Sequence, residues 1–263
     1  MVFNSIHSFL SSIPSGLLGV VFIVVCIVVF VGGLIIFRKF TDKERLKSSQ
    51  DAIIAFMNIV AVLYAVLLAF LVIAVWETFD KNQDNVSSEA NNLGSLLRNV
   101  KLLPEPVKSD LTRELKAYEY CVVNYEWKAM EEGRASDSVK NRITAIFEII
   151  GNYQKALEKE NVVFNQIFKD FNEMLDNRRF RLIASGEGIP SVLWITLIAG
   201  TIATVFFTYY FHIEHFKTHI VFTMVIAIVI GLTLFLVFVL EHPFQDPWKV
   251  TPEPIQKVVE ISG

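Results

Sequence analysis

The sequence has few cysteines and little net charge, and both shortages exclude classes of protein. Cys26 and Cys121 are the only cysteines among 263 residues; one falls in an apolar run and the other in a charged region. Two thiols placed in this way form neither a disulfide framework nor a zinc site. The net charge of −3 provides no basic patch for phosphate contacts, so we expect no nucleic-acid partner.

Catalytic and cofactor motifs are missing as well. The sequence contains no Gly-rich phosphate loop, no nucleophile elbow, no HExxH pair and no CxxC pair. The nearest approach to a metal site is His212, Glu214, His215 and His219, because a helix would place the three histidines on one side. An ordinary solvated hairpin explains them more simply. We therefore expect no enzyme, no catalytic residue, no metal and no cofactor.

Long apolar runs are what the sequence has in abundance. Hydrophobic residues make up 53% of the chain and the mean hydropathy is +0.46. Four runs, at residues 16–37, 52–75, 189–211 and 220–240, are each long enough to cross a hydrocarbon core of ~30 Å. Residues 1–15 hold no Lys or Arg, so the first run does not fit a cleaved secretory signal and is expected to stay as an anchor. The prediction is an all-α membrane protein with four transmembrane helices.

These runs divide the chain into four parts. Residues 1–75 are expected to form a first transmembrane hairpin, and residues 189–240 a second one. Residues 76–188 carry mixed charge and show no β-like alternation, which predicts a soluble antiparallel helical bundle inserted between spans two and three. Residues 241–263 are predicted to be a Pro-rich, partly disordered tail.

The second span is predicted to continue into the bundle as one helix from Ala52 to Leu102. Neither Gly nor Pro occurs in this stretch before Gly94. Its second half has an apolar stripe with helical spacing, namely Val86, Ala90, Leu93, Leu97 and Val100.

Three further helices are predicted in the insertion. The first runs from Pro106 to about Glu132, and a turn at residues 133–136 follows it. The second, capped by Asp137 or Ser138, runs to about residue 159, and the last covers about residues 160–183. The buried stripe expected on the first of these is Leu111, Leu115, Tyr118, Val122 and Tyr125.

The distribution of basic residues indicates the orientation. The loop at residues 38–47 and the hairpin at residues 212–219 hold six Lys and Arg residues, whereas the N-terminal 15 residues hold none and the tail holds two. The positive-inside rule therefore places the connecting segments 38–47 and 212–219 in the cytoplasm. It places the bundle and both termini on the outer side of the cytoplasmic membrane.

Span two carries the candidate pore residues. Asn58 is its only amide, and Ala61, Ala65 and Ala69 continue from it as a small-residue ridge that is expected to pack on another helix. On a different face lie Phe56, Leu63 and Phe70, which are seven residues apart and could form apolar rings in an oligomer. The alternative for this face is lipid contact or bundle core. Trp76 and Glu77 are expected to mark the membrane interface.

A basic cluster follows the last bundle helix. Arg178, Arg179 and Arg181 are suited to attract inorganic anions or to bind lipid phosphate. The alternative is salt bridging to acidic residues near the start of the insertion, and the two roles are compatible. The expected carboxylate partners are Glu77, Asp80 and Asp84.

Several phrases, in their order along the chain, resemble the bacterial bestrophin-like family. They are YAVLLAF at 64–70, Trp76-Glu77, Glu89-Ala90, Glu126-Trp127 with Met130 and Gly133, RFRL at 179–182, Pro190 with Trp194, and Pro243-Phe244 with PEP at 252–254. The resemblance covers about residues 51–258. It departs from the family pattern at Gln245-Asp246, where a small residue and Gly are usual, so the resemblance does not establish a fixed turn there.

The resemblance implies similarity to bestrophins, which are pentameric anion channels whose second span lines the pore. It also implies a cytoplasmic bundle, in conflict with the count of basic residues. Glu241 and Asp246 are too few ligands for a calcium clasp. The predicted function is an oligomeric passive ion channel for anions, with the bundle as its vestibule. The alternative is a membrane-anchored sensor or scaffold whose bundle binds a partner.

Overall fold

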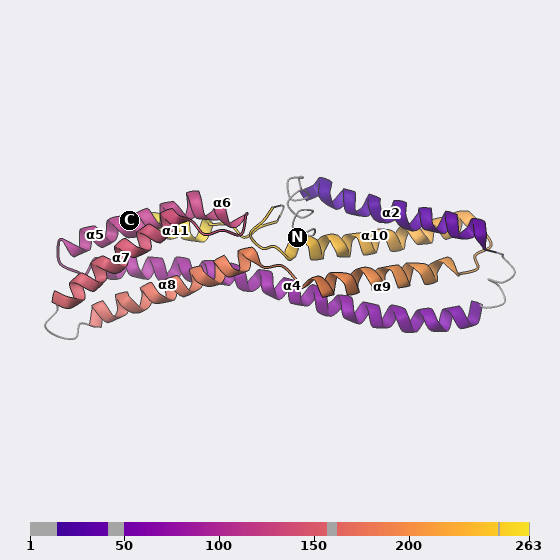
Figure 1. The fold of residues 1–263 in the computed structure, drawn as a ribbon, viewed down its shortest axis with the longest axis horizontal. Coiled ribbons are helices and arrows are strands. Elements are labelled where there is room, and N and C mark those ends of the chain that lie inside the picture. The colour runs from indigo at the N-terminus through magenta and orange to yellow at the C-terminus, as the bar shows by residue number, and fades with distance from the viewer. Residues whose placement is uncertain (1–14, 42–49, 157–161, 247, 263) are drawn as a thin grey trace. The chain divides into compact units, whose positions relative to one another are not determined.

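The computed structural model describes residues 15–41, 50–156, 162–246 and 248–262, and in these ranges the chain is helical and contains no strand. The chain divides into two compact units (Figure 1). Unit 1 comprises Met1–Glu77 and Ile189–Glu241, and unit 2 comprises Thr78–Gly188 and His242–Gly263.

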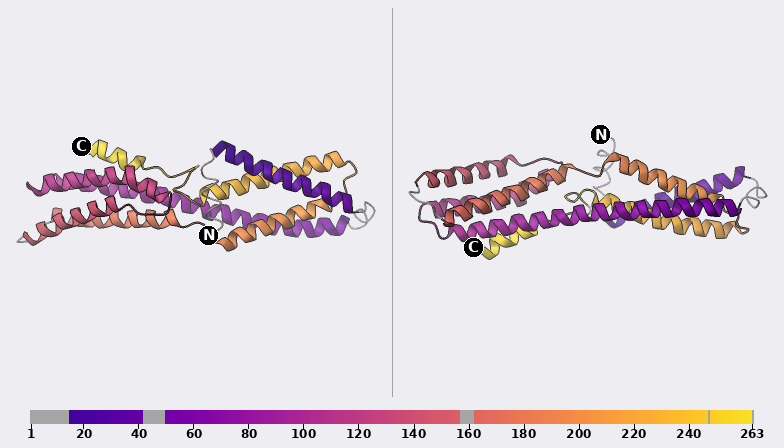
Figure 2. Two further views of the ribbon diagram at one scale, coloured as in Figure 1. Left: turned by 45° about the horizontal axis from the view of Figure 1, so that its top comes forward. Right: turned by 90° about the horizontal axis from the view of Figure 1, so that it is seen from below.

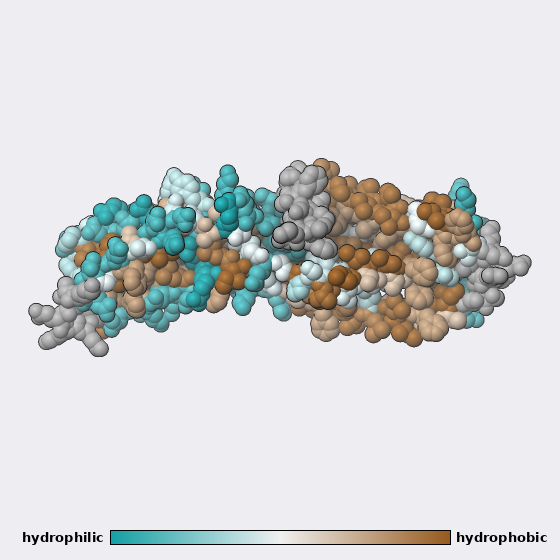
Figure 3. All heavy atoms as spheres, viewed as in Figure 1, coloured by the Kyte–Doolittle hydropathy of each residue, from teal (hydrophilic) through white to brown (hydrophobic). Residues whose placement is uncertain are grey.

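Among the residues that the structure describes, unit 1 holds four helices that are long and apolar enough to cross a membrane, in agreement with the four predicted spans. They are α2 (Ser15–Phe40), the first half of α4 (Gln50–Val100), α9 (Ser191–Tyr209) and α10 (Phe216–Leu240). In Figure 3, hydrophobic side chains gather over these segments, whereas hydrophilic ones dominate over α5, α7 and α8. Such extended apolar exposure on one chain indicates contact with lipid or with further copies.

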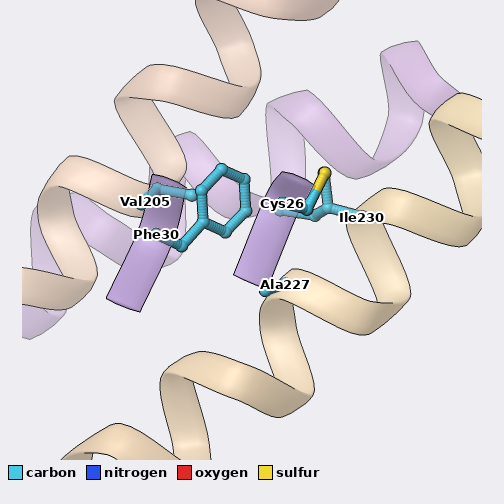
Figure 4. Packing of buried hydrophobic residues seen from close by; sticks show 5 residues of the cluster. All are labelled: Cys26, Phe30, Val205, Ala227 and Ile230. Atoms are coloured by element: carbon cyan, nitrogen blue, oxygen red, sulfur yellow. The ribbon is translucent and has the colours of Figure 1, made fainter. Parts of the chain in front are cut away.

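The core of unit 1 lies where α2, α9 and α10 meet. Figures 1 and 2 show α2 beside α10, and Gly231 brings the two backbones close, because a Cβ there would lie 3.2 Å from the Ile23 Cα. One buried cluster, drawn in Figure 4, consists of Cys26, Phe30, Val205, Ala227 and Ile230. The same three helices contribute to a second cluster, in which Phe22, Trp194 and Phe235 pack against Leu18, Phe238 and Val239.

Helix α4 is continuous from Gln50 to Val100, as the sequence predicts. Its first half exposes large apolar side chains, and its second half buries the predicted stripe. The exposed fraction is 3% or less for each of Val86, Ala90, Leu93, Leu97 and Val100.

Unit 2 contains α5 (Val107–Cys121), a π-helical segment η1 (Val122–Glu126), α6 (Trp127–Met130), α7 (Asp137–Ala156) and α8 (Val162–Gly186). The turn predicted between α6 and α7 is present: Gly133 has a φ of +66° and donates its backbone N–H to Met130 O at 2.9 Å. A left-handed glycine of this kind ends a helix, because other residues resist positive φ.

The register of this region differs from the predicted one. Tyr125, expected in the buried stripe, is 50% exposed, and Glu126 is fully buried instead. The π turn explains the error, because it adds one residue to the helical turn and rotates everything after Val122 relative to an α-helical pattern.

The prediction of a partly disordered tail is wrong for the residues that the structure describes. Helix α11 (Glu253–Ser262) packs on α5 and buries Ile255 completely. The segment before it is held by the Trp127 Nε1–H, which donates to Val250 O at 3.1 Å. A turn is also present at the family departure, where the Gln245 N–H donates to His242 O at 3.1 Å.

Candidate functional site

The predicted pore residues of α4 share one uncovered face. Phe56, Leu63 and Phe70 are 63%, 67% and 69% exposed on the single chain. A spacing of seven residues drifts by only ~20° around a straight α-helix, so the three side chains form one row. The row is available to line a pathway, to meet another copy or to contact lipid.

A neighbouring face of α4 is fixed against α9. The Tyr64 hydroxyl lies 2.5 Å from Thr201 Oγ1 and donates to Leu197 O at 3.1 Å. Gly200 makes room for the tyrosine ring, because a Cβ at that position would overlap it. Tyr64 is one residue, or ~100°, away from Leu63, so this contact sets the direction of the exposed row.

The small-residue ridge does not pack inside the chain. Asn58, Ala65 and Ala69 are exposed, and Ala61 is half-buried. The helix expected to cover this ridge is therefore absent from the part of unit 1 that the structure describes, where Tyr64, Leu71 and Val75 form the buried side of α4 instead.

A shallow apolar hollow of about 490 Å³ adjoins two of the candidate pore residues. Leu63 and Phe70 border it from α4, and Leu193 borders it from α9. The exposed row is thus part of a wider apolar surface rather than an isolated stripe.

Trp76 and Glu77 end the first of the two chain segments that make up unit 1. Both are exposed, and Trp76 leaves 57% of its surface uncovered. The anchoring role that the sequence assigns to them stays a prediction.

The arginines of α8 take different positions from one another. Arg181 is completely buried: its Nε and Nη2 donate to the two Glu89 oxygens at 2.7 and 2.9 Å, and Nη2 also reaches Glu126 Oε2 at 3.1 Å. Its guanidinium lies 4.7 Å from the Trp127 ring centroid, within cation–π range. Burial opposes the charge, but the carboxylates of Glu89 and Glu126 prevail and raise the pKa of Arg181 above its usual value.

The rest of this buried cluster is equally well paired. Arg178 contacts Glu126 through Nε at 3.0 Å and through Nη2 at 2.5 Å. The Tyr118 hydroxyl donates to Glu89 Oε1 at 2.7 Å, and burial together with the Glu89 charge raises the pKa of Tyr118 well above its usual value. The cluster therefore ties α4, α5, η1 and α8 together with balanced charge.

Salt bridging is thus present, but Arg178 and Arg181 pair with Glu89 and Glu126. The prediction that their partners are Glu77, Asp80 and Asp84 is wrong. The actual partners carried two signals in the sequence. Glu89 interrupts the apolar stripe of α4 beside Ala90, and both Glu89 and Glu126 lie in the phrases that resemble the family. Arg179 points elsewhere: it is 65% exposed and pairs with Asp176 at 3.1 Å, so its anion-attracting role stays a prediction.

The histidines of the second hairpin do not gather around a metal position. His219 is 2% exposed; its Nε2–H donates to Thr208 O at 3.0 Å, and its Nδ1 accepts from Arg38 Nη2 at 3.1 Å. Both ring nitrogens are therefore occupied. Across the described residues, no group of three or more His, Cys, Asp or Glu side chains is arranged to hold a metal ion.

Comparisons with known proteins identify the family of this arrangement. The family model described as Bestrophin-like domain matches residues 24–255. A bacterial bestrophin homologue from Klebsiella pneumoniae, solved by Zn-SAD phasing, matches with a TM-score of 0.68 at 12% identity, over 91% of this chain and 96% of that one. A single-substitution variant of that homologue matches with a TM-score of 0.69 at 12% identity, over 91% and 97%. At this identity the likeness shows the fold alone. A comparison with curated proteins gives no match.

Proposed function

The chain belongs to the bestrophin-like family, and from this premise we propose that it forms an oligomeric passive ion channel selective for anions, with α4 lining the pathway. The observation that carries the proposal is the uncovered row of Phe56, Leu63 and Phe70 on a helix whose adjacent face is fixed to α9. In a ring of copies, each residue of the row contributes to one apolar ring.

The spacing of the row suits a gate. At a rise of ~1.5 Å per residue, the three rings lie ~10 Å apart along the helix axis. Apolar constrictions of this kind control conduction by losing and regaining water. We propose five copies, as in the bestrophins that the sequence resembles, with Asn58 and the alanine ridge facing the next copy or the pathway.

Unit 2 is proposed to be a soluble antiparallel helical bundle, inserted between spans two and three, that forms a vestibule. Its link to the pathway is α4 itself, which continues from the membrane span into unit 2 without a break. Arg179 leaves 65% of its side chain in solution, where a guanidinium can raise the local concentration of inorganic anions.

We further propose that the protein lies in the cytoplasmic membrane, with the connecting segments 38–47 and 212–219 on the cytoplasmic side and unit 2 on the outer side. An Ala135→Cys variant tests the orientation, because Ala135 is exposed whereas both native cysteines are buried. A membrane-impermeant maleimide should label this variant in intact cells. Labelling only after permeabilisation would overturn the proposed side.

The function is tested with purified protein in liposomes. In detergent, the expected mass is that of several chains. In liposomes, the expected chloride flux exceeds the flux from empty liposomes, and it also exceeds the potassium flux measured under the same conditions. A larger potassium flux would contradict anion selectivity, and no flux from inserted oligomers would contradict a channel.

The second candidate is a membrane-anchored sensor or scaffold, which is favoured by a hollow of about 540 Å³ in unit 2. Tyr120 and Tyr125 line it together with Asn141 and Arg142. Aromatic faces beside polar groups are typical of small-molecule sites. A protein that stays monomeric in detergent and conducts no ion would support this candidate over the channel.

A further inference from the structure

A second apolar pocket lies at the end of unit 1 that carries residues 212–219, and none of the three candidate pore residues lines it. Its volume is about 580 Å³, within the usual range for ligand sites. The lining is almost wholly apolar and comes from α4, α9, the hairpin and α10. It includes Met57, Phe211, Ile213, His219, Phe222 and Val225.

A cationic side chain stands directly behind this lining. Arg38 donates from Nη2 to Ile213 O at 3.0 Å and to His219 Nδ1 at 3.1 Å, so it contacts two pocket residues. Its Nε–H is buried and has no hydrogen-bond partner among the described residues. No carboxylate within the described ranges forms an ion pair with it either.

A second orphaned nitrogen is found at the same end. His212 stands between the pocket residues Phe211 and Ile213, and its buried Nδ1 also lacks a partner in the described part of the chain. Buried polar groups without partners are rare, and two of them beside one pocket indicate that a polar ligand group completes the site.

We propose that this pocket holds one acyl chain of an anionic phospholipid, whose phosphate is bound by Arg38 and His212. The apolar lining fits an acyl chain, and the orphaned nitrogens fit the oxygens of a phosphate, which a guanidinium binds well. Exposed Lys217 adds positive charge to the same end of unit 1. This inference concerns lipid binding and holds whether or not the protein conducts ions.

Other occupants leave part of the site unsatisfied. An apolar helix of a second copy would cover the pocket but leave Arg38 Nε and His212 Nδ1 without a partner. Free inorganic phosphate would satisfy the nitrogens but leave the pocket unfilled.

The headgroup is tested by titrating phosphatidylglycerol, phosphatidylcholine or inorganic phosphate into the delipidated full-length protein in detergent. Binding is measured by the shift of the thermal unfolding midpoint and by native mass spectrometry. Phosphatidylglycerol should bind as an adduct and raise the midpoint; the other two probes should not. Arg38→Gln should weaken phosphatidylglycerol about tenfold, the equivalent of one charge-assisted hydrogen bond. Lys39→Gln removes the same charge from the neighbouring exposed residue and should bind as wild type.

The acyl chain is tested independently with a variant that fills the pocket. Val225→Trp places an indole in the pocket and should abolish the adduct, whereas Val229→Trp alters a similarly exposed valine of α10 one turn away and should retain it. Equal binding of both phospholipids, equal loss in the Arg38 and Lys39 variants, or binding that persists in Val225→Trp would overturn the proposal. Stabilisation by inorganic phosphate alone would overturn the lipid as its source.

Discussion

The carboxyl group of Glu241, directly after α10, is a titratable group whose surroundings affect its protonation. The Trp194 Nε1–H donates to Glu241 Oε2 at 2.6 Å. Burial raises the pKa of Glu241 to about 7, although the bond from Trp194 opposes this rise. A carboxyl group whose pKa is higher in the folded state than its unfolded value of 4.5 binds more protons when folded.

The stability of the protein should therefore depend on the state of Glu241 between pH 4.5 and pH 7. Its contribution is fully present below pH 4.5 and is lost as the pH rises through about 7. Glu241→Gln should flatten the decline of the thermal unfolding midpoint across this window. Glu187→Gln, at an exposed glutamate, should leave the slope unchanged. If the midpoint of Glu241→Gln declines with pH as steeply as that of wild type, the pH dependence arises from other groups.

The buried arginine cluster makes a second residue-scale prediction. Arg181→Leu leaves Glu89 and Glu126 buried with less compensating charge, and breaking such a cluster costs about 3–5 kcal/mol of unfolding free energy. Denaturant unfolding in mild detergent measures the loss. Arg179→Leu, on the exposed side of α8, should change stability little, and equal losses in the two variants would contradict the role of Arg181.

Ion pairing of these arginines was the alternative that the sequence left open, but the sequence could not predict with which residues they pair. Choosing Glu89 and Glu126 over Glu77, Asp80 and Asp84 requires the rotation of α4 and the register of η1. Both depend on packing between elements distant in sequence, and the π turn gives no periodic signal of its own.

At the scale of elements, the turn between α6 and α7 depends on one glycine. Gly133→Ala places a side chain at φ +66° and should lower stability by about 1 kcal/mol. Gly151→Ala is the matched control, because Gly151 lies inside α7 with nothing near its missing Cβ. This control should be neutral or stabilising, since alanine is the better helix former. Chemical unfolding of both variants tests the difference, and a neutral Gly133→Ala would show that the turn tolerates another conformation.

Helices that bury a regular stripe were predictable from the sequence. The stripe of α4, the start of α7 near Asp137 or Ser138 and the approximate extent of α8 follow from spacing and capping residues. The tail was not, because Pro243, Pro252 and Pro254 suggest irregular chain. What orders it is tertiary contact, with Phe244 packed edge-on against Trp127 at 6.0 Å and Ile255 buried on α5.

At the scale of the whole molecule, composition and run length were enough to predict an all-α protein with four membrane spans. The assignment of the α4 faces was not predictable in the same way. The alanine ridge predicted packing on another helix without saying whether that helix belongs to the same chain, and within the chain Tyr64 and Gly200 form the contact between α4 and α9. The surfaces left uncovered are those that further copies and lipid would occupy, and a single sequence does not specify them.

The central claim is that the row on α4 lines the pathway, and chloride efflux from liposomes tests it most directly. Leu63→Ala should raise the efflux over wild type, because a smaller side chain widens and wets an apolar ring. Leu232→Ala makes the same change at an exposed leucine of α10 and should leave the efflux at the wild-type level. Equal efflux from both variants and wild type, with all three shown to be inserted and oligomeric, would contradict this account.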